Sequence, residues 1–97
     1  MPVFENQNNL KNAAVLLKAV ANEKRLKILC VLSDGEKCVG SLEELIDLSQ
    51  SALSQHLARL RRDEIVTTRR DAQTIYYSIS DENVIKLLHH VCELTIK

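Results

Sequence analysis

The chain has 97 residues, 13 basic and 13 acidic side chains and a formal net charge of zero. This length fits one domain over residues 1–97, and a domain so small buries little surface alone, which favours a dimer. Two tyrosines and one phenylalanine give no stacking surface for single-stranded nucleic acid. No apolar run spans a bilayer, and residues 1–6 lack a signal-peptide pattern. We therefore expect a cytoplasmic protein.

Two helices are predicted at the start of the chain. Residues at helical spacing form an apolar stripe on the first: Leu10, Ala13, Ala14, Leu17, Val20 and Ala21. Asn22 is a good N-cap for the second helix, which the turn at 33–35 ends. Three residues of this second helix are expected to face inward: Leu26, Leu29 and Cys30. A short extended piece follows around 37–39.

A helix-turn-helix is predicted in the centre of the chain. Residues 41–44 have the spacing of a capping box, so a brief third helix is expected to run to about Asp47. It is expected to bury three apolar residues: Leu42, Leu45 and Ile46. The turn 47–49 leads into a fourth helix, whose leucines at helical spacing face the core: Leu53, Leu57 and Leu60. Two helices joined by so short a turn are typical of this DNA-binding motif.

The opposite face of the fourth helix carries hydrogen-bonding groups without charge: Gln50, Ser51, Ser54 and Gln55. Glutamine amides and serine hydroxyls suit base edges in a major groove, although an ordinary solvated helix face is the alternative. Five of the six arginines follow within twelve residues: Arg59, Arg61, Arg62, Arg69 and Arg70. This local basic patch favours phosphate binding by a chain that is neutral as a whole.

A β-hairpin, or wing, and a last helix complete the predicted fold. Residues 65–70 and 74–79 are rich in β-branched and aromatic residues, and the loop 71–73 separates them. The hairpin tip presents Arg69, Arg70 and Gln73 to a DNA backbone or minor groove, although such a tip can also serve solubility alone. Ser80 is expected to cap the last helix, whose apolar stripe comprises Val84, Leu87, Leu88, Val91 and Leu94. The fold class is mainly α with a two-stranded wing, with about five helices.

The chain resembles the winged-helix repressors of the ArsR/SmtB superfamily. The runs that carry the resemblance are 16–26, 48–57 and 69–78, and they are most similar to NolR-like and HlyU-like members, which lack the usual metal sites. The resemblance implies a homodimer, joined through its first and last helices, that regulates transcription on the bacterial nucleoid. It places the fourth helices in successive major grooves of an imperfect palindrome in duplex DNA. Implied contacts come from Gln50, Ser51, Ser54, Gln55, His56, Arg59, Arg61, Arg62, Arg69, Arg70 and Gln73.

The metal motifs of this superfamily are broken in the chain. The Cys-x-Cys pair that starts the third helix in metal sensors is Cys38-Val39-Gly40 here, and residues 81–83 lack the histidine of the last-helix site. His89 and His90 point about 100° apart on a helix and cannot share a metal. We therefore expect no metal or other cofactor, and DNA binding that is insensitive to zinc, cadmium and arsenite.

A thiol switch, a protein-contact module and an enzyme are the alternatives to a plain DNA-binding repressor. Persulfide-sensing relatives pair a cysteine of the second helix with one near the chain end; Cys30 matches the first, and Cys92 lies one helical turn before the second. The opposing interpretation is that Cys30 is buried and inert. A winged helix used only for protein contacts is the other alternative. An enzyme is not expected, because no Cys/His/Asp arrangement at a suggestive spacing is present.

Overall fold

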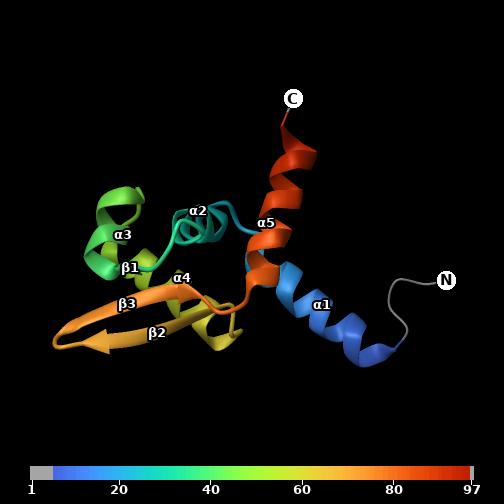
Figure 1. Ribbon diagram of the computed structural model, residues 1–97, viewed down its shortest axis with the longest axis horizontal. Helices are drawn as coiled ribbons and strands as arrows, with labels where there is room; N and C mark the ends of the chain where they lie inside the picture. The colour runs from blue at the N-terminus through green and yellow to red at the C-terminus, as the bar shows by residue number, and fades with distance from the viewer. Residues whose placement is uncertain (1–5, 97) are drawn as a thin grey trace.

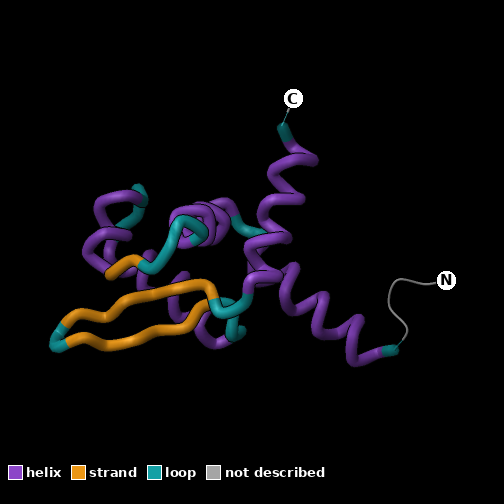
Figure 2. The backbone as a smooth tube through the Cα atoms, viewed as in Figure 1, coloured by secondary structure: helices purple, strands orange, loops and turns teal. Residues whose placement is uncertain are grey.

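The computed structural model describes residues 6–96, which form five helices and a three-stranded sheet (Figures 1 and 2). Residues 1–5 lie outside the described residues, and they include Phe4 and most of the segment that lacks a signal-peptide pattern. Lys97 lies outside them as well. In chain order the elements are α1 (Gln7–Val20), α2 (Glu23–Leu32), β1 (Lys37–Cys38), α3 (Val39–Leu45), α4 (Gln50–Arg62), β2 (Val66–Asp71), β3 (Thr74–Ile79) and α5 (Glu82–Thr95). The predicted fold class is confirmed, and β1 adds a third strand to the wing.

Polar side chains cap four of the helices, and at α1 the Asn6 carboxamide oxygen accepts from Asn9 N–H at 2.8 Å. The Asn22 carboxamide oxygen accepts hydrogen bonds from the backbone N–H groups of Lys24 and Arg25 at 2.9 and 3.1 Å, which confirms it as the N-cap of α2. The hydroxyl of Ser49 accepts from Ala52 N–H at the start of α4. The predicted cap of α5 is wrong by one residue: Asp81 is the cap. Ser80 is still tied to the end of the hairpin, because its N–H donates to Ile65 at 2.9 Å.

The third helix differs from its prediction at both ends. α3 starts at Val39, directly after the strand, and Cys38 is its N-cap without a side-chain capping bond. Ser41 therefore lies inside the helix, and the predicted capping box is wrong. Leu42 and Ile46 are buried as expected, but Leu45 is 52% exposed, because the helix ends there and the chain turns toward α4.

A Schellman motif ends α4 and directs the chain into the wing. Ile65 N–H donates to Leu60 O at 2.9 Å, and Glu64 N–H donates to Arg61 O at 3.0 Å. Glu64 takes the left-handed conformation that this motif requires, with φ 60°. Leu60 and Ile65 are both buried, which is the apolar contact that accompanies such an end.

The sheet has strand order β1-β3-β2 and is antiparallel throughout. Asp71 pairs with Thr74, so the hairpin loop contains residues 72–73 only, one residue fewer than predicted. Side chains alternate across the sheet, and the face that carries Val66 and Tyr77 packs against the core. The outer face carries Arg69 and its cross-strand neighbour Tyr76.

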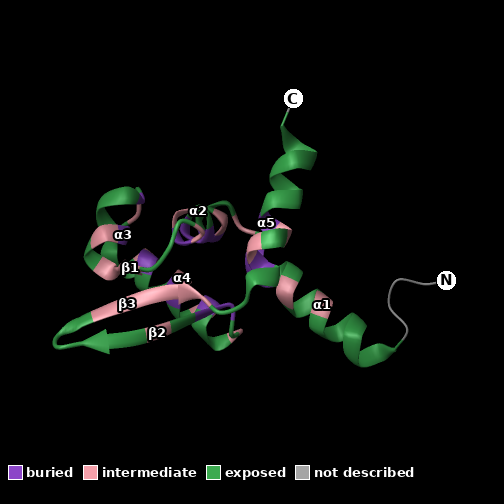
Figure 3. Cartoon of the chain, in the orientation of Figure 1, coloured by how far each residue is buried: buried purple, intermediate pink, exposed green. Residues whose placement is uncertain are grey.

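The core lies between α2, α4 and the inner face of the sheet (Figure 3). Leu53, Leu57 and Leu60 are buried in it as predicted. Cys30 was expected to face inward, but it is exposed. The buried face of α2 is instead formed by Arg25, Ile28, Leu29 and Leu32.

Most exposed apolar side chains lie on two helices. Within residues 6–96, six of the seven large exposed hydrophobic residues lie on α1, on α5 or at its C-cap: Leu10, Val15, Leu17, Val91, Leu94 and Ile96. The predicted stripe of α5 is therefore buried only in its first half, at Val84 and Leu88. Both helices extend from the body of the molecule (Figures 1 and 3). No helix in the part of the chain that the structure describes is long and apolar enough to cross a membrane.

Candidate nucleic-acid interface

The outer face of α4 presents uncharged polar side chains to solvent. Gln50, Ser51, Ser54 and Gln55 are all exposed, while the leucines on the opposite side of the helix fix it against the core. Gln50 Nε2 donates a hydrogen bond to Glu43 Oε1 on α3 at 3.3 Å, which links the two helices of the motif. The other three side chains make no hydrogen bond within residues 6–96 and are available to a ligand.

His56 and Arg59 lie on the inner edge of α4. Burial lowers the pKa of His56, and the positive charge of Arg25 lowers it further. Arg59 is partly covered: its Nε is buried without a hydrogen-bond partner among the described residues and lies 3.7 Å from Asp63 Oδ2. Both side chains therefore reach solvent only in part, unlike the glutamines and serines of the outer face.

Arg61 and Arg62 extend the polar face of α4 with positive charge. Arg62 is 72% exposed, with its Nε 3.7 Å from Asp63 Oδ1. Arg61 is exposed and makes no ion pair within the described residues. An open hollow of about 480 Å³ between α4 and the sheet is lined by Val39, Ser54, Leu57, Ala58, Arg61, Arg62 and Tyr77. The basic end of α4 and its polar face thus border one concave surface.

The two arginines of the wing differ in their surroundings. Arg69 is held by both carboxylate oxygens of Glu36, at 2.6 and 2.7 Å. Arg70 and Gln73 are exposed and make no hydrogen bond or ion pair among residues 6–96. Because strand alternation places Arg70 on the same face as Tyr77, it projects on the side of the wing that carries the hollow beside α4.

Buried Arg25 is a structural residue that sequence reasoning missed. It is 8% exposed, and its Nε and Nη2 donate to the carbonyl oxygens of Ala19 and Lys18 at 2.5 and 3.2 Å. These two carbonyls lie in the last turn of α1, beyond which the helix supplies no further N–H groups to bond them. Burial lowers the pKa of Arg25, and the nearby charge of Arg59 lowers it further. An arginine within an otherwise apolar helix face was the available signal.

The cysteines form no pair within the described residues. Cys30 and Cys92 are exposed, and Cys38 is half-buried, with its Sγ 3.4 Å from the Ser41 hydroxyl. The hydrogen bond from Ser41 lowers the pKa of the Cys38 thiol. No group of three His, Cys, Asp or Glu side chains in residues 6–96 is placed to hold a metal ion. His90 lies 3.9 Å from Glu93 on the exposed side of α5.

Known proteins share this arrangement over nearly the whole chain. A family profile described as "Bacterial regulatory protein, arsR family" matches residues 22–68. The transcriptional activator HlyU of Vibrio cholerae is 54% identical over 94 residues, which cover 94% of this chain and 87% of that protein. The chain belongs to the ArsR family of bacterial regulatory proteins. It is thus a transcriptional regulator with a winged helix-turn-helix, and not an enzyme.

Two solved structures show the same winged helix. The transcriptional repressor BigR of Xylella fastidiosa is 33% identical, with a TM-score of 0.87 over 94% of this ArsR-family chain and 93% of that one. A homodimeric winged helix-turn-helix DNA-binding domain from Mycobacterium bovis is 29% identical, with a TM-score of 0.82 over 97% of this chain and 89% of that one. The similarity therefore includes α1 and α5 as well as the central motif.

Proposed function

We propose that this ArsR-family regulator is a homodimeric repressor that binds an imperfectly palindromic operator in duplex DNA. One observation carries the proposal: the exposed, uncharged polar face of α4 lies beside Arg61, and Arg70 projects from the face of the wing that borders the same hollow. Base edges need neutral donors and acceptors, whereas phosphates need cations, and this surface offers both. The site of action is the bacterial nucleoid, and each subunit acts as a single domain.

Dimerisation supplies the symmetry that a palindrome requires. The exposed apolar side chains of α1 and α5 are the surface on which a second copy packs, and the Mycobacterium relative is a homodimer. Two copies related by a two-fold axis present two α4 helices to successive major grooves. Occupation of such an operator excludes other proteins from it, which results in repression.

The proposed contacts divide into two classes. Base edges are assigned to four residues of α4: Gln50, Ser51, Ser54 and Gln55. Phosphates are assigned to the exposed cations Arg61, Arg62 and Arg70, with Gln73 at the wing tip. His56 and Arg59 are secondary contacts at the inner edge of α4, because both are partly covered. Arg69 lies on the wing, where both carboxylate oxygens of Glu36 hold it.

Base and phosphate contacts predict different responses to substitution. Gln55→Ala should weaken operator binding by about 1–3 kcal/mol and leave random duplex DNA almost unaffected, because base contacts carry the discrimination. Arg70→Ala should weaken both DNAs alike and lower the slope of log K against log salt by about 0.9. Fluorescence titration of genomic fragments at two salt concentrations measures both effects. Equal, sequence-independent losses in the two variants would contradict α4 as the reader of bases.

A thiol-responsive repressor is the second candidate. One observation favours it: Cys30 and Cys92 are both exposed and accessible to oxidants. We nevertheless expect the double variant Cys30→Ser/Cys92→Ser to respond to diamide as the wild type does. Cys92 lies one helical turn before the position of the second cysteine in persulfide-sensing relatives, and this shift disfavours a disulfide with Cys30. Release of DNA on oxidation by the wild type and not by the double variant would establish this candidate.

A winged helix used only for protein contacts makes a different prediction. It requires that no genomic fragment binds more tightly than random duplex at either salt concentration. Specific binding that is lost in Gln55→Ala excludes this alternative, because that variant changes only one exposed side chain of α4.

A further inference from the structure

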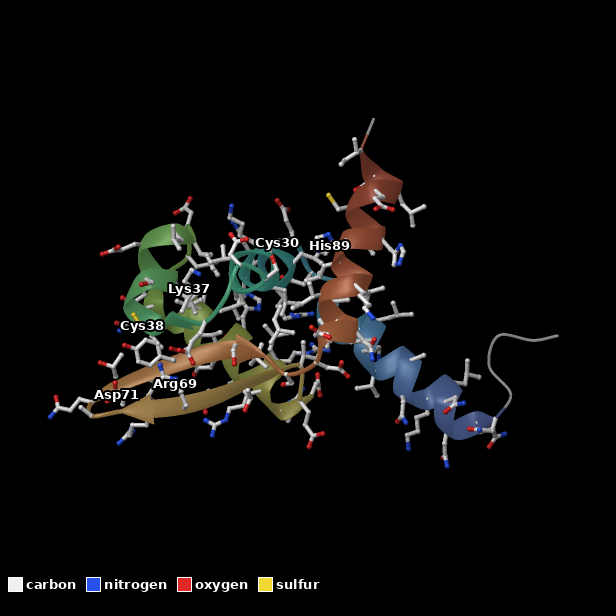
Figure 4. All side chains as sticks on the ribbon, in the orientation of Figure 1. Cys30, Lys37, Cys38, Arg69, Asp71 and His89 are labelled. Atoms are coloured by element: carbon white, nitrogen blue, oxygen red, sulfur yellow. The ribbon has the colours of Figure 1, made fainter. Side chains whose placement is uncertain are left out.

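An ion pair joins the wing to the segment that precedes β1. Arg69 Nε donates to Glu36 Oε2 at 2.7 Å and Arg69 Nη2 donates to Glu36 Oε1 at 2.6 Å, so the carboxylate is bound through two hydrogen bonds. The guanidinium carbon also lies 4.4 Å from the centre of the Tyr76 ring on β3. We name these three residues the wing clamp. Figure 4 shows Arg69 on the side of the hairpin that faces Lys37 and Cys38.

The wing clamp lies at the point where the wing extends beyond the body of the molecule. Cys38 pairs with Tyr76, and Tyr76 pairs with Arg69, so this row is the last in which three strands lie side by side. Beyond it, residues 70–75 form a ribbon of two strands, which extends past β1 (Figure 1). A two-stranded ribbon has little stability of its own, so its direction is set where it joins the body.

The charges of the two groups are matched and stable near neutral pH. The hydrogen bond from Arg69 lowers the pKa of Glu36, and the same bond raises the pKa of Arg69. The contact with Glu36 therefore occupies the Nε–H group and one N–H group of Nη2 and offsets the charge of Arg69, which weakens its attraction for a phosphate. Arg70, on the opposite face of the hairpin, has no such bonds to break within residues 6–96.

We propose that Arg69 is a positioning residue: Glu36 and Tyr76 hold it, and together they fix the direction of the wing, while Arg70 carries the wing's charge to the phosphates. This inference rests on the proposed function in DNA binding. It assigns adjacent arginines to separate tasks. Glu36, which lies in a different part of the chain, becomes a determinant of operator affinity without touching DNA.

Conservative substitutions separate positioning from phosphate binding. Arg69→Lys keeps the charge but loses the planar fork, so it should lower operator affinity about as much as Arg69→Ala, by about three- to tenfold, with an unchanged salt slope. Arg70→Lys is the matched control and should keep both affinity and slope. Glu36→Gln should cause the same loss as Arg69→Lys, and the double variant should lose no more than either alone, because both break one interaction.

Hydrogen exchange without DNA tests the wing clamp independently of DNA binding. Amides of residues 70–75 should exchange faster in Glu36→Gln and in Arg69→Lys than in the wild type, whereas amides of α2 and α4 should not change. If the wild type bound no DNA at all, the proposed function would fail, and this measurement would still decide the positioning role.

Two results would overturn the inference. An increase in affinity in Glu36→Gln, with a salt slope steeper by about 0.9, would show that Arg69 is a phosphate contact that Glu36 withholds. Unchanged exchange of residues 70–75 in both variants would show that the wing clamp does not hold the wing.

Discussion

The exposed apolar faces of α1 and α5 give a quantitative prediction for dimerisation. Leu17 on α1 is 55% exposed in the single chain. Burying a whole leucine side chain is worth about 1.5–3 kcal/mol, so covering this exposed part contributes about 1 kcal/mol in each subunit. A symmetric dimer contains two copies, and Leu17→Ala should therefore cost about 2 kcal/mol, which raises the dimer Kd about 30-fold.

Leu45 provides the matched control for this measurement. It is 52% exposed, nearly as much as Leu17, but it lies on α3, away from α1 and α5. Sedimentation equilibrium from nanomolar to micromolar concentrations should show the higher Kd for Leu17→Ala and the wild-type Kd for Leu45→Ala. The thermal midpoint of the wild type should also rise with concentration. A folded wild-type monomer at micromolar concentration, or equal Kd values for the two variants, would refute the reasoning.

Three further predictions concern stability. Arg25→Ala removes two hydrogen bonds to the end of α1 and should lower the free energy of unfolding by about 3 kcal/mol in urea at fixed protein concentration; a loss below about 1 kcal/mol would contradict the anchoring role. Glu64→Gly relieves a left-handed backbone just after the end of α4 and should stabilise by about 0.5–1 kcal/mol, whereas Ala58→Gly, at an exposed position inside α4, should destabilise by about 1 kcal/mol. Burial and then Arg25 lower the pKa of His56, so its neutral form stabilises the fold above about pH 6.5, and this contribution is lost as the pH falls through the lowered pKa. His56→Gln should therefore flatten the fall of the thermal midpoint between about pH 7 and pH 5; an unchanged profile would count against this origin.

The features that depend on near neighbours in the chain were predictable from the sequence. Helical spacing identified Leu53, Leu57 and Leu60 as core residues, and with them the exposed polar face of α4. The cap at Asn22 was predicted because a cap bonds backbone groups only two or three residues ahead. Capping patterns are less reliable where two short elements meet. The start of α3 was predicted wrongly because the pairing of Cys38 with Tyr76 ends β1 at Cys38, and the helix begins at the next residue.

Contacts between distant parts of the chain were decided by the tertiary structure alone. Cys30 has the residue type of the core but lies outside it, because the position of α4 and the sheet determines which side of α2 is covered. Glu36 and Arg69 are 33 residues apart, and no periodicity connects them. Local patterns determine the face on which a side chain lies, and only packing determines what that face meets. The sequence by itself therefore determined the winged helix and its polar reading face, whereas the structure decided which arginines of that surface are held and which are available.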